Sequence, residues 1–98
     1  MEDESLKTPD YILKLYITGA SPNSAKAISN IKTICDKYLK SSYKLEIIDI
    51  YQQPAVARKE EIVALPLLVR SAPLPIKRLI GNMSDTEKVL KGLELQEF

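Results

Sequence analysis

A strand, a helix and a second strand follow one another between Tyr11 and Ile50, and this order limits the chain to folds built around a parallel pair of strands. The apolar run 11–18 is typical of a central strand, and Gly19 marks its end. Ser21 is a suitable N-cap, and Pro22 fits the first turn of a helix. The run 43–50, rich in Tyr, Leu and Ile, predicts the next strand. We therefore expect a right-handed βαβ unit.

One apolar stripe runs along the predicted helix, because its apolar side chains recur at spacings of three and four residues. These side chains are Ile28, Ile31, Ile34, Cys35, Tyr38 and Leu39. Cys35 is the only residue of the chain with a thiol. Since a free cysteine on an apolar stripe is usually a small core side chain, we expect it to be buried.

The second half of the chain has weaker local signals. Its Ala, Arg, Lys and Glu content favours a short helix over Ala55–Val63. Prolines then divide the apolar residues into Leu67–Val69 and Ile76–Ile80, which we interpret as strands. Ser84 and Glu87 match a capping box at the start of a final helix, which we expect Gly92 to interrupt. The predicted order of elements is βαβαββα.

Composition excludes several classes of function. The chain has no histidine and one cysteine, so it cannot form a Ser/His/Asp triad, a Cys/His dyad, a histidine metal site or an internal disulfide. Its 14 basic and 13 acidic residues give a net charge of +1, without the basic excess that nucleic-acid binding requires. We expect no cofactor and no metal.

The two ends of the chain and the length of its apolar runs bear on organisation and location. We expect residues 1–10 to be a flexible leader, residues 11–95 one domain, and residues 96–98 a short tail. No apolar run approaches the ~20 residues that a membrane helix needs, and the first residues are acidic where a secretory signal is basic. These features predict a cytoplasmic protein that does not contact a membrane.

The predicted order of elements, with Pro66 at the start of the first hairpin strand, resembles the thioredoxin fold, in which that proline is usually cis. Enzymes of that fold carry their redox cysteines in the loop and first helical turn after the first strand. Residues 19–24 occupy that place here and read Gly-Ala-Ser-Pro-Asn-Ser, so Cys-x-x-Cys chemistry is excluded. A thioredoxin-like thiol enzyme that uses Cys35 with an external thiol is an alternative.

Several strings of residues resemble the KaiB family of circadian clock proteins without an obvious gap from Tyr11 to about Leu95. The strings are Leu13-Lys14-Leu15-Tyr16-Ile17-Thr18-Gly19, Ser21-Pro22-Asn23-Ser24, Ile80-Gly81, Ser84, Glu87-Lys88-Val89-Leu90 and Gly92-Leu93. The resemblance implies a non-enzymatic adaptor that docks on the ring of the P-loop ATPase KaiC. It also implies a second, ground-state packing of the carboxy-terminal half, often in a homo-oligomer (dimer or tetramer). A stand-alone sensory module of a histidine kinase is a further alternative.

The resemblance also implies roles for individual residues. The positions that match KaiC-contacting or basic surface residues are Ala64, Arg70, Lys77 and Arg78. Lys26 and Glu46 lie on the face offered to a further partner, and Gly92 and Glu94 match positions that bias the switch between the two folds. From the residues alone, the pair Lys77-Arg78 also fits a solvated strand edge, where charge discourages aggregation.

The sequence departs from the pattern of cyanobacterial members of the family at several positions. The departures are Glu46 and Glu61 in place of lysine, Leu65 and Leu67 in place of threonine, Asn82 in place of aspartate, and an end at Phe98 without an acidic tail. The reversed charge at Glu46 disfavours binding of the oscillator partner KaiA. We therefore expect a divergent member, acting in circadian-type timing or in stress-adaptation signalling.

Overall fold

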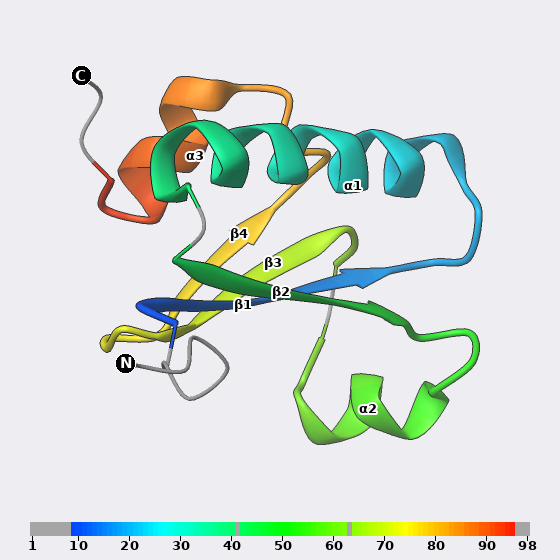
Figure 1. The fold of residues 1–98 in the computed structure, drawn as a ribbon. Coiled ribbons are helices and arrows are strands. Elements are labelled where there is room, and N and C mark those ends of the chain that lie inside the picture. The colour runs from blue at the N-terminus through cyan, green and yellow to red at the C-terminus, as the bar shows by residue number, and fades with distance from the viewer. Residues whose placement is uncertain (1–8, 41, 63, 96–98) are drawn as a thin grey trace, which may run out of the picture.

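The fold is a four-stranded sheet with helices on both faces (Figure 1). The computed structural model describes residues 9–40, 42–62 and 64–95. The elements in chain order are β1 (Tyr11–Ile17), α1 (Pro22–Ile34), its π-helical continuation η2 (Cys35–Leu39), β2 (Tyr43–Asp49), α2 (Pro54–Lys59), β3 (Leu67–Ala72), β4 (Lys77–Ile80) and α3 (Thr86–Gly92). This is the predicted order βαβαββα.

The strands lie in the order β2-β1-β3-β4, so β1 is central and β2 and β4 are the two edges of the sheet. β1 pairs with β2 in parallel, as the βαβ reading predicts, and β3 pairs antiparallel with both β1 and β4. Because β1 is covered on both faces, its residues are apolar with little alternation.

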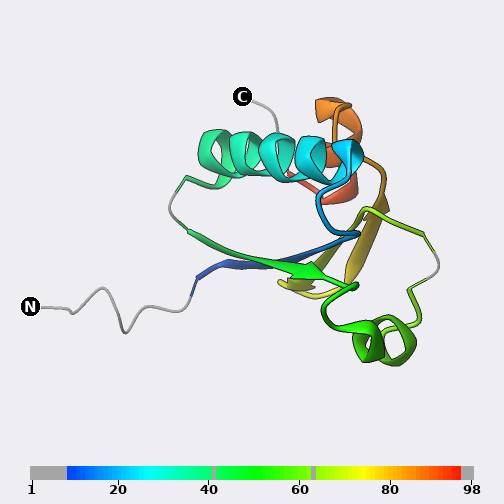
Figure 2. The ribbon, with the colours of Figure 1, turned by 90° about the vertical axis from the view of Figure 1, so that its right-hand side faces the viewer.

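Two hydrophobic clusters lie on opposite faces of the sheet. α1 and α3 cover one face and α2 covers the other (Figures 1 and 2). Leu13 and Leu15 of β1 join the larger cluster with Ile31 of α1 and Leu90 of α3. Tyr16 points to the other face, where it packs in the smaller cluster. This distribution follows from the period of two along a strand.

The start of α1 confirms the sequence reading. The hydroxyl oxygen of Ser21 accepts a hydrogen bond from the backbone N–H of Ser24 at 3.1 Å, and Pro22 lies in the first turn. Of the predicted stripe, Ile31, Ile34, Cys35 and Leu39 are buried, while Ile28 and Tyr38 are partly buried against the same cluster. The helix therefore turns the expected face to the sheet.

The predicted bounds in the second half needed correction. α2 ends at Lys59 rather than Val63, because the chain turns at Glu60 and reaches a positive φ of 54° at Glu61; Val63 itself lies outside the described residues. β3 extends to Ala72, three residues beyond the prediction, since pairing with β1 on one side and β4 on the other supplies hydrogen-bond partners for its backbone.

The capping-box prediction for α3 was wrong by one residue. Asp85 is the N-cap, and its carboxylate accepts a hydrogen bond from the N–H of Lys88 at 3.1 Å. The N–H of Ser84 instead donates to the side-chain oxygen of Asn82, which places Ser84 in the preceding turn. Gly92 is the last residue of α3 and does not interrupt it.

The described residues begin at Pro9, two residues before the predicted start of the domain at Tyr11. Residues 1–8 and 96–98, which contain most of the expected leader and the tail, lie outside the described residues. Asp10, however, accepts a hydrogen bond from the hydroxyl of Ser42 at 2.6 Å, so it belongs to the folded unit. Among the described helices, none has the length and apolar character needed to cross a membrane.

Candidate partner-binding surface

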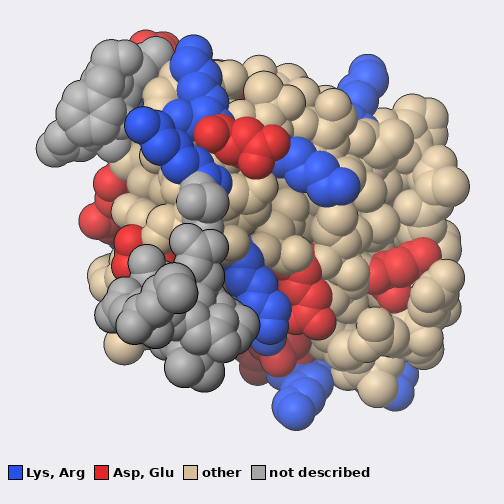
Figure 3. Space-filling view, in the orientation of Figure 1, with Lys and Arg blue, Asp and Glu red and all other residues tan. Residues whose placement is uncertain are grey.

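The residues expected to bind partners lie in three places. Arg78 and Lys77 are on the edge strand β4, and Ala64 lies in the segment that leads into β3. Glu46 is exposed on β2, at the opposite edge of the sheet, and Lys26 is exposed on α1. The fold therefore separates the expected KaiC-contacting residues from Glu46. Over the face shown in Figure 3, basic and acidic side chains are intermixed, in keeping with the net charge of +1.

Ala64 and Arg78 line one hollow of about 320 Å³ beside β4. Ile80 of β4 and Lys88 of α3 also line it, and Ile80 is 59% exposed. Residues from the α2–β3 segment, β4 and α3 thus meet at this edge although they are far apart in the sequence. The hollow therefore combines an exposed apolar side chain with two cations.

Arg78 connects β4 to the end of α2. Its guanidinium donates a hydrogen bond to the carbonyl oxygen of Glu60, the C-cap of α2, at 3.1 Å. The buried ring of Tyr16 lies on the same face, where burial raises its pKa, the charges of Glu60 and Glu46 raise it further, and that of Arg78 lowers it. Arg78 therefore holds one wall of the hollow as well as carrying charge.

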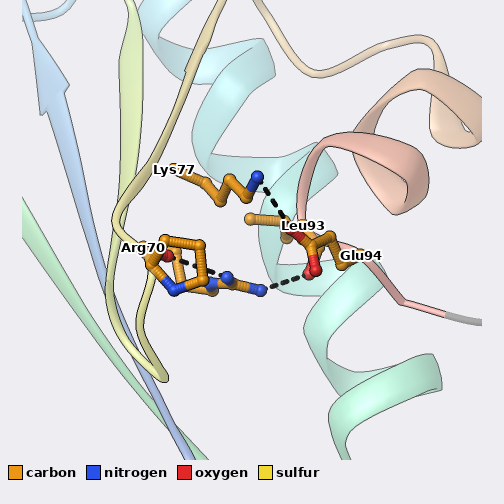
Figure 4. A network of polar contacts seen from close by, with 5 residues as sticks. Arg70, Lys77, Leu93 and Glu94 are labelled. Atoms are coloured by element: carbon orange, nitrogen blue, oxygen red, sulfur yellow. Dashed lines mark hydrogen bonds and ion pairs between the residues drawn. The ribbon is translucent and has the colours of Figure 1, made fainter.

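The expectation that Arg70 belongs to the basic surface is wrong in this fold. Arg70 is only 3% exposed, because it lies on the face of β3 that α3 covers. Its guanidinium donates to the carbonyl oxygens of Leu93 at 2.6 Å and Pro75 at 2.8 Å (Figure 4). Arg70 thus joins the end of α3 to the β3–β4 hairpin. The surface position was implied by the family resemblance, and a buried arginine is uncommon unless it is paired.

Lys77 and Glu94 form an ion pair with 2.7 Å between nitrogen and oxygen, beside the Arg70 network (Figure 4). The hydrogen bond from Lys77, followed by its charge, lowers the pKa of the Glu94 carboxyl. Both side chains remain partly exposed, so the pair contributes little to stability. The structure therefore places Lys77 on the α3 side of β4, with its ammonium engaged by Glu94.

Pro66 and Gly92 occupy positions with specific packing. The Leu65–Pro66 peptide bond is cis, as the thioredoxin resemblance implied, and Pro66 is buried where β3 begins. Gly92 packs against Leu79, since a Cβ at this position would lie 2.9 Å from the Cγ of Leu79. Glycine is thus the residue that lets the end of α3 approach β4 closely.

The place of the redox cysteines in thioredoxins holds hydroxyl groups in this chain. Ser21 donates a hydrogen bond to the hydroxyl oxygen of Ser24 at 2.8 Å, and that oxygen accepts from the N–H of Thr18. Cys35 lies in the core with no exposed surface, as predicted. Its burial, with a smaller contribution from the charge of Asp36, raises the pKa of the thiol to about 12. A thiol in this state is a poor nucleophile.

Sequence reasoning missed the apolar side chains at the rim of this edge. Leu74 and Ile76 are 76% and 58% exposed, in the hairpin loop that leads into β4. The sequence predicted a strand here, with a solvated edge as one interpretation of Lys77-Arg78, but not that apolar side chains are exposed along it. Alternation of Ile76, Arg78 and Ile80 on one side of the strand was the available signal. In the described residues, no group of His, Cys, Asp and Glu is arranged to hold a metal ion.

Known proteins similar in sequence point to one family. The profile of the KaiB domain matches residues 14–95. The Circadian clock oscillator protein KaiB of Prochlorococcus marinus is 46% identical over 85 residues, which cover 87% of this chain and 79% of the relative. The Circadian clock protein KaiB3 of Synechocystis is 49% identical over 84 residues, covering 86% and 82% of the two chains.

Solved structures show the fold class. The N-terminal domain of Synechococcus elongatus SasA has a TM-score of 0.72 at 22% identity, covering 100% of this chain and 95% of that domain. The thioredoxin Deadhead of Drosophila has a TM-score of 0.69 at 15% identity, covering 93% and 84% of the two chains. The fold is therefore thioredoxin-like, and with the sequence matches it follows that the chain belongs to the KaiB family.

Proposed function

We propose that this chain is a non-enzymatic adaptor that binds the ATPase ring of a KaiC-type protein in the cytoplasm. It would act in circadian-type timing or in stress-adaptation signalling. The observation that carries the proposal is the family match over residues 14–95, with relatives named circadian clock oscillator proteins. The state of Cys35 supports a binding role over thiol chemistry, because its thiol is buried and its pKa is raised to about 12.

The proposed docking surface is the β4 edge, with Ala64, Arg78 and Lys77 as its residues. Arg78 is exposed, and it lines the same hollow as Ala64. Arg70 supports this surface from behind, since it holds the hairpin that leads into β4. Cations at a rim mainly assist association, so the complex should weaken as salt is added.

Native mass spectrometry with the KaiC-type ATPase encoded in the same genome tests the proposal. The two proteins are incubated together for long periods with and without ATP, because a change of fold before binding would be slow. We expect a complex that Arg78→Glu weakens and that Lys26→Glu, a charge reversal at an exposed residue of α1, leaves intact. Absence of a complex under all these conditions would refute the proposal.

Lys26 and Glu46 are proposed to face a second partner. Glu46 is exposed on the free edge of β2, and its acidic charge disfavours KaiA. Glu46→Lys should therefore increase any binding to KaiA, and Lys26→Glu should reduce binding of the second partner. If neither change affects such a complex, the assignment of Lys26 and Glu46 to the binding surface of the second partner is refuted.

A second packing of the residues after Ile50, in a homo-oligomer, is a further proposal. Pro66, Gly92 and Glu94 would bias it, since they lie where β3 begins and where α3 ends. In solution NMR, two slowly exchanging sets of resonances restricted to this half would support it. One set would favour a fixed fold, as expected of a sensory module of a histidine kinase.

A further inference from the structure

The outer side of β4 has backbone groups without strand partners. Among the described residues, β4 pairs with β3 alone. The N–H of Gly81 donates to the carbonyl oxygen of Pro66 at 2.9 Å. This bond shows which residues of β4 direct their backbone groups toward β3. Because alternate residues of an antiparallel strand bond to the same neighbour, Leu79 turns its N–H and C=O toward β3. Arg78 and Ile80 then turn theirs outward.

A trough runs along this free edge. The hollow of about 320 Å³ and a second hollow of about 160 Å³ share Leu79, Ile80 and Lys88 among their lining residues. Ala64 in the α2–β3 segment contributes to one wall, and Val89 at the start of α3 contributes to the other. Figure 2 shows β4 at the border of the sheet, between the level of α3 and that of α2. An extended chain fits a trough of this kind.

The chemistry of the trough favours apolar and acidic side chains. Ile80 is 59% exposed, and Ile76, which precedes β4, is 58% exposed. Arg78 and Lys88 place two cations beside Ile80, and Glu61 adds one carboxylate to the wall of the larger hollow. The carboxylate of Asp85 is already engaged as the cap of α3. A second copy of β4 is disfavoured as the occupant, because it would bring its own Lys-Arg pair to the same edge.

We propose that the free edge of β4 binds an extended segment of a partner protein as an added strand, with an acidic residue opposite Arg78 and an apolar residue two positions away, opposite Ile80. The backbone groups of Arg78 and Ile80 would supply the hydrogen bonds. Alternate side chains of the segment would enter the hollows and meet Arg78 and Lys88. The natural partner rests on the proposed function, but this mode of binding is testable without the ring.

A phage-displayed library of random linear peptides, selected on the full chain, is the probe. Enriched peptides should carry an acidic residue and an apolar residue two positions apart, because Arg78 and Ile80 share one face of β4. Ile80→Pro should weaken them about five- to tenfold, because proline removes an outward N–H without removing a bond to β3. Ile80→Ala is the matched control, since it keeps the N–H and shortens the side chain. Lys88→Glu should weaken the binding of acidic peptides and reduce the salt dependence of that binding.

Hydrogen exchange of the unaltered chain gives a second measurement, which does not depend on the folding of Ile80→Pro. The amides of Arg78 and Ile80 should be unprotected in the free chain and protected with the enriched peptide, whereas that of Leu79 is protected in both. Unchanged exchange at Arg78 and Ile80, equal binding by Ile80→Pro and Ile80→Ala, or no enriched peptide would overturn the proposal. Ring binding that Ile80→Pro leaves intact would overturn it while the proposed function stands.

Discussion

Replacing Arg70 tests whether one buried cation holds the end of α3 against the β3–β4 hairpin. Its guanidinium donates to the carbonyl oxygens of Leu93 and Pro75, at 2.6 and 2.8 Å. Its Nε has no hydrogen-bond partner among the described residues, so the two Nη bonds, with the nearby charge of Glu94, compensate for burying the charge. The chain contains no carboxylate that hydrogen-bonds to Arg70 in its described part.

The magnitude follows from these two bonds. A hydrogen bond from a charged donor contributes about 1.5–3 kcal/mol net, so two contribute about 3–6 kcal/mol. In Arg70→Ala, water can reach the exposed Pro75 carbonyl but not the buried Leu93 carbonyl, and the cost of burying the charge disappears. We expect the free energy of unfolding to fall by about 2–4 kcal/mol. Arg70→Met retains most of the packing but not the hydrogen bonds, so its free energy of unfolding should fall by most of the same amount.

Urea denaturation followed by circular dichroism measures the change, with an unaltered m-value as the sign of a comparable unfolded state. Hydrogen exchange should show α3 losing protection more than α1 does. Lys77→Met is the matched control, because it removes the neighbouring, partly exposed ion pair and should cost less than about 1 kcal/mol. If Arg70→Ala lies within about 0.5 kcal/mol of the wild type, the reasoning on buried charged bonds is refuted.

Three further predictions follow from the perturbed side chains. Lys77 lowers the pKa of Glu94 below 4.5, so the stabilisation from this ion pair is present above pH 4.5 and is lost as the pH falls through the lowered pKa. The difference in unfolding free energy between wild type and Glu94→Gln should therefore shrink at low pH, and a constant difference would contradict this. The hydrogen bond to Asp36 raises the pKa of Tyr43 from 10.0 to about 12, so its stabilisation should be lost between these pH values, measured against Tyr43→Phe. An aromatic disulfide reagent should modify Cys35 slowly in the native chain and rapidly in denaturant, and rapid native labelling would argue against its burial.

Local signals were sufficient for the first half of the chain. Ser21, Pro22 and the apolar stripe of α1 predict the helix because capping and periodicity act within a few residues. The same signals failed by one residue at α3, where Ser84 and Asp85 both suit an N-cap. The side chain of Asn82 engages the N–H of Ser84, and this contact decides between them.

The candidate surface was only partly predictable. Lys77 and Arg78 were expected at a strand edge or a binding patch, and both lie on the edge strand β4. Arg70 was assigned to the same surface by the family resemblance, and its residue type agreed, since arginine is rarely fully buried unless it is paired. Its burial depends on α3 covering that face of β3, which involves residues more than twenty positions later in the sequence. The exposure of Ile76 and Ile80 likewise depends on the position of β4 as the last strand of the sheet in the described part of the chain.

The sequence by itself determined the order of elements, the burial of Cys35, the missing redox cysteines and the family resemblance, since each follows from residue type and short-range spacing. Only the tertiary structure decided which strand forms the free edge, which cations remain exposed and which one joins α3 to the hairpin. The physical reason is that residue type sets the cost of burying a charge, whereas packing between distant elements sets whether hydrogen bonds offset that cost.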